Sequence, residues 1–190
     1  MDIPLRFLEK IVSADALVEV TDSNHQPLLY LPWEQVLRQR LPFKLAVLVI
    51  KNHLHQIFLK KKTSTDARKK GTLWGLDITP IFPEEARKDA ALRMAPDATG
   101  IAHMSVEEDL RLPIPYANHI EMSFFTTWMP GDIPPMPREE TPLLLVDTDE
   151  IQGLLETMPE ALAPEVHILA KAQGICGGGN IYPLPQKYPT

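Results

Sequence analysis

The sequence predicts a mixed α/β (α+β) domain built around one central sheet. Residues 44–50, KLAVLVI, form a continuous apolar run of the kind found in buried strands. Residues 119–128, HIEMSFFTTW, read as a second long strand, and residues 84–95 between them are rich in helix-favouring side chains. Because strands and helices alternate along the 190-residue chain, we predict one main domain over residues 16–174.

The first third of the chain predicts a short arm, a hairpin and a helix. Residues 1–15 are expected to form an N-terminal arm or a short helix. Residues 16–22 alternate between apolar and polar, residues 23–27 are turn formers, and residues 28–31 return as apolar, which together favour a β-hairpin. Residues 33–41 then place apolar side chains at helical spacing, which predicts a short helix.

The remaining elements follow from similar signals. Residues 56–62 run back from the central strand and are expected to be its hairpin partner. The helix over residues 84–95 begins with two glutamates at its positive end. Residues 143–151 predict a strand that turns into a helix, and residues 159–174 predict a final helix. The Gly- and Pro-rich residues 175–190 are expected to be a flexible tail.

Composition limits the classes of function. The chain is 44% hydrophobic and 23% charged, and it has no apolar run near the roughly 20 residues that cross a membrane. We expect no signal peptide and a cytoplasmic location. The single cysteine, Cys176, excludes an internal disulfide and a multi-cysteine metal site. A net charge of −6 argues against nucleic acid as the main partner.

Residues 60–70 are strongly basic, with six Lys and Arg residues against one acid. A charge run of this kind is either a solvated surface loop or a region that attracts an anionic ligand. If the second interpretation holds, Lys60, Lys62 and Arg68 are the candidate contacts for a small anion such as a nucleotide or a diphosphate.

The order of elements, the segment LWGLD (73–77) and the helix that ends in TGI (99–101) resemble a Nudix protein over residues 16–172. The family signature reads G-x5-E-x7-R-E-U-x-E-E-x-G-U, with U apolar. Glu85, Arg93, Gly100 and Ile101 fit this pattern. The likeness is greatest to bacterial members that begin with an extra hairpin. The resemblance implies a Nudix-like α/β/α sandwich with a mixed sheet, in which Glu85 and Arg93 tie the loop to the helix.

The same resemblance implies that the metal-binding part of the signature is incomplete. In the family, three glutamates after the arginine hold a divalent metal, and here these positions carry Met94, Asp97 and Ala98, while Thr79 replaces the leading glycine. Magnesium prefers hard oxygen ligands, which a thioether and a methyl group do not supply. No cofactor is therefore expected, although Mg²⁺ or Mn²⁺ would be required if hydrolase activity remains.

Several residues keep alternative interpretations. Pro96 predicts that the helix ends by about Ala95, because proline removes a backbone donor. Asp97 is either a turn residue or a residual metal ligand. The acidic residues 107–109 are either a solvated loop or replacement ligands, and Glu121 is a candidate catalytic carboxylate together with Glu85 and Asp97.

Three functions are consistent with these residues. The first is a Nudix-fold protein whose metal-dependent pyrophosphohydrolase activity is lost or weak and which keeps a ligand or partner pocket. The second is a divergent hydrolase of a nucleoside diphosphate derivative, with metal held by Asp97, Glu85 and either Glu121 or the acids at 107–109. The third is a scaffold or homodimerisation module that uses the fold surface and the proline-rich residues 130–142.

Overall fold

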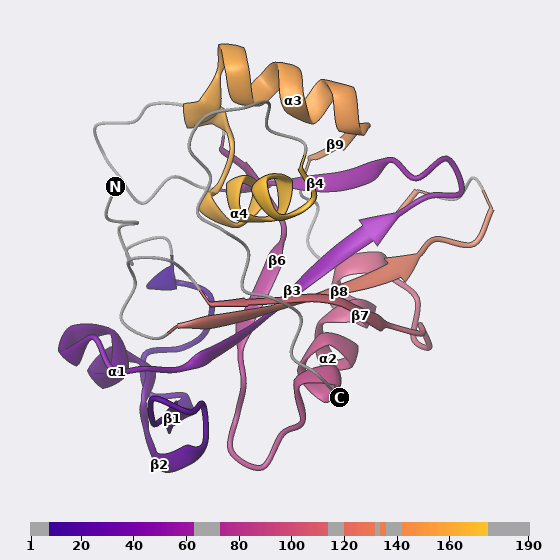
Figure 1. Cartoon of the computed structure of the whole chain (residues 1–190). Helices are drawn as coiled ribbons and strands as arrows, with labels where there is room; N and C mark the ends of the chain where they lie inside the picture. The colour runs from indigo at the N-terminus through magenta and orange to yellow at the C-terminus, as the bar shows by residue number, and fades with distance from the viewer. Residues whose placement is uncertain (1–7, 63–72, 114–119, 132–133, 136–141, 175–190) are drawn as a thin grey trace.

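The computed structural model describes residues 8–62, 73–113, 120–131, 134–135 and 142–174 (Figure 1). In chain order the elements are β1 (Leu17–Thr21), β2 (Pro27–Pro32), α1 (Trp33–Gln39), β3 (Lys44–Lys51), β4 (Ile57–Lys62), β5 (Leu73–Gly75), β6 (Asp77–Pro80), α2 (Arg87–Thr99), β7 (Glu107–Pro113), β8 (Glu121–Trp128), β9 (Leu143–Val146), α3 (Thr148–Thr157), the 3₁₀ turn η2 (Pro159–Ala161) and α4 (Pro164–Ala172).

Strand β3 is the centre of a seven-stranded mixed sheet. It pairs in parallel with β8 along its whole length, and β6 pairs antiparallel with its first half. The predicted hairpin with residues 56–62 is present only at its turn end, where Ile50 and Lys51 pair with β4. Beyond that point the same edge of β4 pairs with β5, because β6 occupies the corresponding edge of β3, and β9 pairs along the opposite edge of β4.

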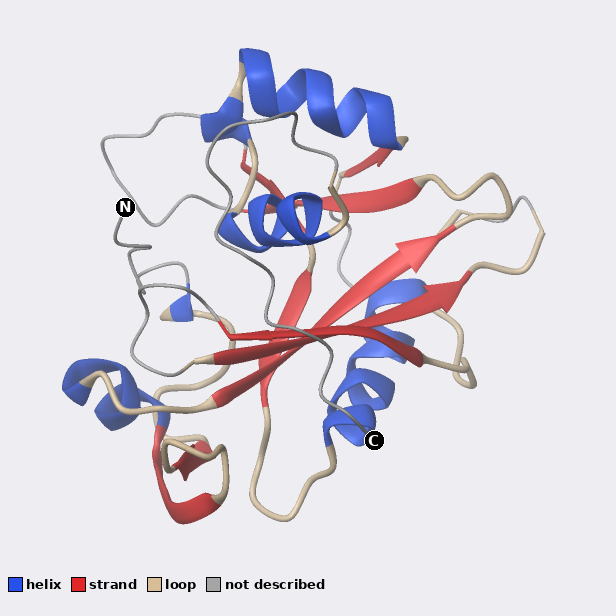
Figure 2. Cartoon of the chain, in the orientation of Figure 1, coloured by secondary structure: helices blue, strands red, loops and turns tan. Residues whose placement is uncertain are grey.

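Alternate side chains of β3 face two separate apolar layers. Leu45, Val47 and Val49 pack in one cluster with side chains of α3 and α4. The intervening residues Ala46 and Leu48 pack in a second cluster with the alanines of α2. Figures 1 and 2 show α3 and α4 on one side of the sheet and α2 on the other. The predicted class, an α/β/α sandwich around a mixed sheet, is confirmed.

The predicted N-terminal hairpin is also present, as β1 and β2 in a separate two-stranded sheet (Figure 2). Trp33 anchors this part of the chain, since its indole Nε1–H donates to the Leu8 carbonyl at 3.0 Å. Its ring meets Phe43 edge to face at 5.0 Å between centroids. Leu8 is fully buried in the same cluster as Trp33, so the segment from Leu8 onward packs with the main domain.

The strands β6 and β7 were not predicted, and several helix boundaries differ from the prediction. Residues 107–109, expected to form a loop, begin the edge strand β7 paired with β8. The proline-punctuated residues 77–80 form β6. The final helix is shorter than predicted, because Pro164 starts α4 and residues 159–161 form a separate turn. Within the described residues, no helix is both long and apolar enough to cross a membrane.

Candidate functional site

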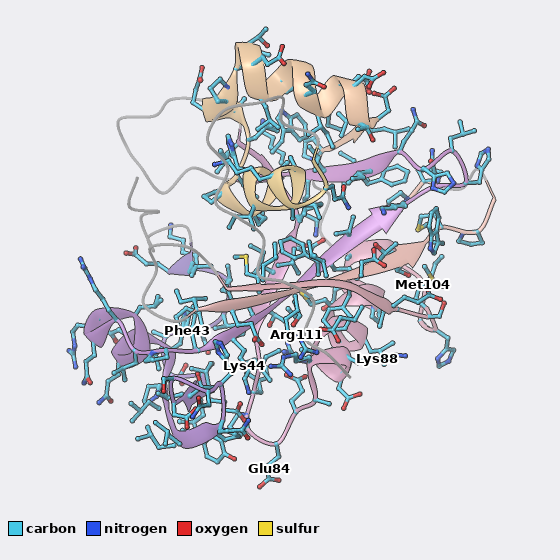
Figure 3. The ribbon with its side chains drawn as sticks, in the orientation of Figure 1. Phe43, Lys44, Glu84, Lys88, Met104 and Arg111 are labelled. Atoms are coloured by element: carbon cyan, nitrogen blue, oxygen red, sulfur yellow. The ribbon has the colours of Figure 1, made fainter. Side chains whose placement is uncertain are left out.

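The segment that resembles the Nudix signature runs from the end of β6 through α2. The helix occupies Arg87–Thr99, so the predicted range of 84–95 was wrong at both ends. Glu84 has a φ of 60°, which is a left-handed conformation outside the helix. Figure 3 shows the Glu84 side chain pointing away from the body of the protein. At the other end, Gly100 adopts a φ of 76° and caps the helix, with its N–H donating to the Pro96 carbonyl at 2.9 Å.

Pro96 lies inside the last turns of α2 and does not end the helix at Ala95, as predicted. A proline at this position removes one hydrogen bond, the one that its N–H would have donated to the Leu92 carbonyl. The turn that follows is held by Thr99. Its hydroxyl donates to the Ala95 carbonyl at 2.7 Å and accepts from the Ile101 N–H at 3.1 Å.

Glu85 and Arg93 join the loop to the helix through two parallel contacts. Arg93 Nε lies 2.8 Å from Glu85 Oε1, and Nη2 lies 3.1 Å from Oε2. Nη2 also donates to the Thr79 hydroxyl and to the Pro80 carbonyl, at 3.1 and 3.3 Å. The guanidinium stacks over the Phe82 ring at 4.0 Å. These contacts use both oxygens of Glu85, so its carboxylate holds the arginine.

The three positions that carry metal ligands in the Nudix pattern do not form an oxygen-rich group. Met94 packs against the apolar cluster beneath α2, and Ala98 is only 2% exposed within it. Asp97 is exposed. Met104 packs on the same cluster from the loop after α2. The donor set at these three positions, one carboxylate with a buried methyl group and a thioether, does not fit Mg²⁺.

Glu121 is buried at the start of β8 and is held by groups from two other elements. Arg87, the first residue of α2, contacts Glu121 Oε1 through Nη2. His25, in the turn between β1 and β2, places Nε2 3.8 Å from Glu121 Oε2. Both carboxylate oxygens therefore face cationic or polar nitrogen groups of the protein itself.

A second buried ion pair lies beside this one. Lys44 pairs in register with Glu121 across β3 and β8, and its Nζ lies 2.9 Å from Glu19 Oε1. Figure 3 shows Lys44 beside Phe43 at the start of β3. Sequence analysis missed Glu19, Lys44, Arg87 and His25. One feature of the sequence could have revealed this pair. Lys44 begins an otherwise apolar strand, and a buried charge requires a partner of opposite charge.

The acids at 107–109 are distributed along β7 and do not converge. Glu108 pairs with Arg111 at 2.8 Å. Asp109 accepts a hydrogen bond from the Thr126 hydroxyl and lies 4.0 Å from Lys51 Nζ. No group of three or more His, Cys, Asp or Glu side chains suited to a metal occurs in the part of the chain that the structure describes.

The basic candidates on β4 have carboxylate partners. Lys60 Nζ lies 2.7 Å from Asp77 Oδ1, and Lys62 Nζ lies 2.5 Å from Glu165 Oε1. The Glu165 side chain is fully buried at the start of α4, where the same oxygen accepts the Leu76 N–H at 3.0 Å. Sequence analysis missed Glu165 as the partner of Lys62. Arg68 lies outside the described residues, as does Cys176.

The family comparisons are limited to structure. No family model matches the chain, and no curated protein matches it. The structure of DR0079 from Deinococcus radiodurans superposes with a TM-score of 0.64 at 10% identity and covers 82% of this chain and 97% of that one. At this level of identity, the likeness shows a shared fold.

MutT proteins also occur among the similar structures. A MutT from Aliivibrio salmonicida or Vibrio cholerae gives a TM-score of 0.47 at 17% identity, over 67% of this chain and 98% of that one. The MutT protein from Methanosarcina mazei Go1 gives 0.44 at 18% identity, over 59% and 82%. Both scores are too low to support an inference about function.

Proposed function

We propose that this chain is a Nudix-fold protein whose signature helix has lost the metal-binding carboxylates while its structural pair is retained. Metal-dependent pyrophosphohydrolase activity is then absent or weak, and binding of a small anionic ligand or a partner is the retained function. The sandwich of helices around a mixed sheet and the contact between Glu85 and Arg93 are compatible with this proposal.

The observation that carries the proposal is the position of Met94 and Ala98. Both side chains contribute to the apolar packing between α2 and the sheet, where carboxylates would be desolvated. A helix that buries a thioether and a methyl group at these positions uses them for apolar packing. The family pattern uses the same positions for metal binding. The remaining carboxylate, Asp97, is exposed.

Metal titration tests this proposal directly. Mn²⁺ added to ¹⁵N-labelled protein should produce no selective broadening of the amide signals of α2. Selective broadening there at millimolar or lower Mn²⁺ would show a metal site and would contradict the proposal. A Mg²⁺-dependent screen for phosphate or nucleotide release from nucleoside diphosphate derivatives should show no turnover above a protein-free blank.

Restoring the carboxylates separates a lost activity from one that was never present. Met94→Glu, Pro96→Ala and Ala98→Glu are combined, with glutamine in place of both glutamates as the matched uncharged control. Because Ala98 is buried, a second variant with Met94→Glu and Asp97→Glu leaves that position unchanged. Metal binding that appears only in a glutamate variant supports the proposal.

The alternative is a divergent hydrolase that binds metal through other carboxylates. Of its candidates Asp97, Glu85, Glu121 and the acids at 107–109, the carboxylates of Glu85, Glu121 and Asp109 contact an arginine or a hydroxyl. Metal binding through these three would have to displace that group. Release of product by the unmodified chain, abolished by Glu121→Gln and by EDTA, would favour this alternative.

A further inference from the structure

Helix α2 packs on the sheet mainly through small side chains. Its buried residues are four alanines and a threonine: Ala90, Ala91, Ala95, Ala98 and Thr99. Each alanine contributes a single methyl group and buries little apolar area. The larger side chains that complete this layer from α2 and the loop after it are only partly buried: Leu92, Met94, Ile101 and Met104. The packing of α2 therefore depends on long side chains that solvent can reach.

Two of these side chains are thioethers. Met94 and Met104 are both half-buried, and both pack against the same apolar cluster. The other methionines of the described residues lie in different surroundings. Met122 and Met129 are at most 3% exposed, whereas Met158 is 48% exposed and belongs to neither apolar cluster. Among the described methionines, only Met94 and Met104 combine access to solvent with a position in the layer beneath α2.

The backbone of α2 is weakened in the turn that contains Met94. Pro96 lies inside the helix and has no N–H to donate to the Leu92 carbonyl. Met94 lies between these two residues in the sequence. Because this turn lacks one backbone hydrogen bond, the packing of its side chains against the sheet makes a larger contribution to holding it in place.

We propose that Met94 and Met104 are a modification site for hydrogen peroxide, and that their oxidation loosens α2 from the sheet. The thioether sulfur attacks one peroxide oxygen, an S–O bond forms and the O–O bond breaks. The sulfur loses two electrons, and the second oxygen leaves as water with both protons. The sulfoxide is polar, and packing it in an apolar layer without a hydrogen-bond partner is unfavourable. Methionine sulfoxide reductases reverse the change. The proposal is independent of any metal chemistry on α2.

Graded treatment of the full chain with hydrogen peroxide tests the proposal. Peptide mass spectrometry measures the sulfoxide at each methionine, and circular dichroism measures the melting temperature of the same samples. Met158 should be oxidised first, without a change in melting temperature, because it is exposed and outside both apolar clusters. Oxidation of Met94 and Met104 should follow and lower the melting temperature by about 4–8 °C. Met122 and Met129 should react last.

Leucine variants assign the effect to these two residues. Met94→Leu combined with Met104→Leu keeps a similar apolar volume and removes the oxidisable sulfur. This variant retains Cys176 and all other methionines, so a loss caused by them would remain. It should keep its melting temperature after the same peroxide treatment. Met158→Leu is the matched control and should lose as much as the unmodified chain. The two single variants, Met94→Leu and Met104→Leu, should each show an intermediate loss.

Amide hydrogen exchange locates the structural change. In the oxidised chain, exchange should become several-fold faster in α2 and stay unchanged in α3. Treatment with methionine sulfoxide reductases should restore both the melting temperature and the exchange rates. Sulfoxide at Met94 and Met104 with an unchanged melting temperature would overturn the proposal. An equal loss in the double and single leucine variants and in the unmodified chain would also overturn it, as would oxidation of Met122 and Met129 before these two residues.

Discussion

Replacing Lys62 with methionine is predicted to destabilise the whole domain, although lysine is usually a surface residue. The substitution would leave the fully buried Glu165 carboxylate with one remaining donor, the Leu76 N–H. Removing one partner of a buried ion pair typically costs about 3–5 kcal/mol. Because Lys62 is itself 25% exposed, we expect a value near the lower limit, about 3 kcal/mol. For a chain of this length, that value lowers the melting temperature by about 6–12 °C.

The measurement is urea unfolding followed by circular dichroism, with two companion variants. Lys60→Met, on the same strand as Lys62, removes a pair with Asp77 in which neither side chain is fully buried, at 22% and 23% exposed, and it should cost no more than about 1 kcal/mol. Combining Lys62→Met with Glu165→Gln removes both charges but keeps an acceptor for Leu76. This double variant should return to within about 1 kcal/mol of the original stability. Equal and small losses of stability for both single lysine variants would refute the reasoning. Lys62 would then again be a candidate for binding an anion.

Three further predictions concern the helices. Arg93→Lys should lower stability by about 1–2 kcal/mol in urea unfolding, because a lysine cannot form the two-pronged contact with Glu85; an unchanged midpoint would show that the contact is not needed. Pro96→Ala should raise stability by about 1–2 kcal/mol, since it returns a hydrogen bond to the Leu92 carbonyl, and a lower melting temperature would contradict this. Asp147→Ala should cost about 1 kcal/mol, because it removes the capping box at the start of α3; a cost below 0.3 kcal/mol by the same assay would show that the cap is dispensable.

Helices and strands that are defined by the apolar pattern of a short stretch of sequence were predicted well. The central strand, the long strand β8 and the helix beginning at Trp33 appear where the apolar pattern places them. The helix α2 was found but misplaced by a few residues at each end. Its start depends on the left-handed backbone of Glu84, and its end depends on Gly100 rather than on Pro96.

The contacts of the candidate site were also predicted only in part. The contact of Glu85 with Arg93 could be anticipated, because both residues fall within one loop and helix. The partners of Glu121 could not be anticipated, because they are distant in the sequence. His25 lies in the turn between β1 and β2, and Arg87 is the first residue of α2. Strand β7 was missed because an edge strand exposes much of its length to water and can carry three acids in a row.

The sequence by itself determined the class of fold, the two buried strands and the absence of a carboxylate at positions 94 and 98. These features depend on residue type and short-range spacing, which the chain displays directly. Only the tertiary structure decided that Lys62 meets Glu165 across 103 residues and that Met94 and Ala98 join an apolar layer. Each of these depends on which elements become neighbours, and that follows from the packing of the whole domain around β3.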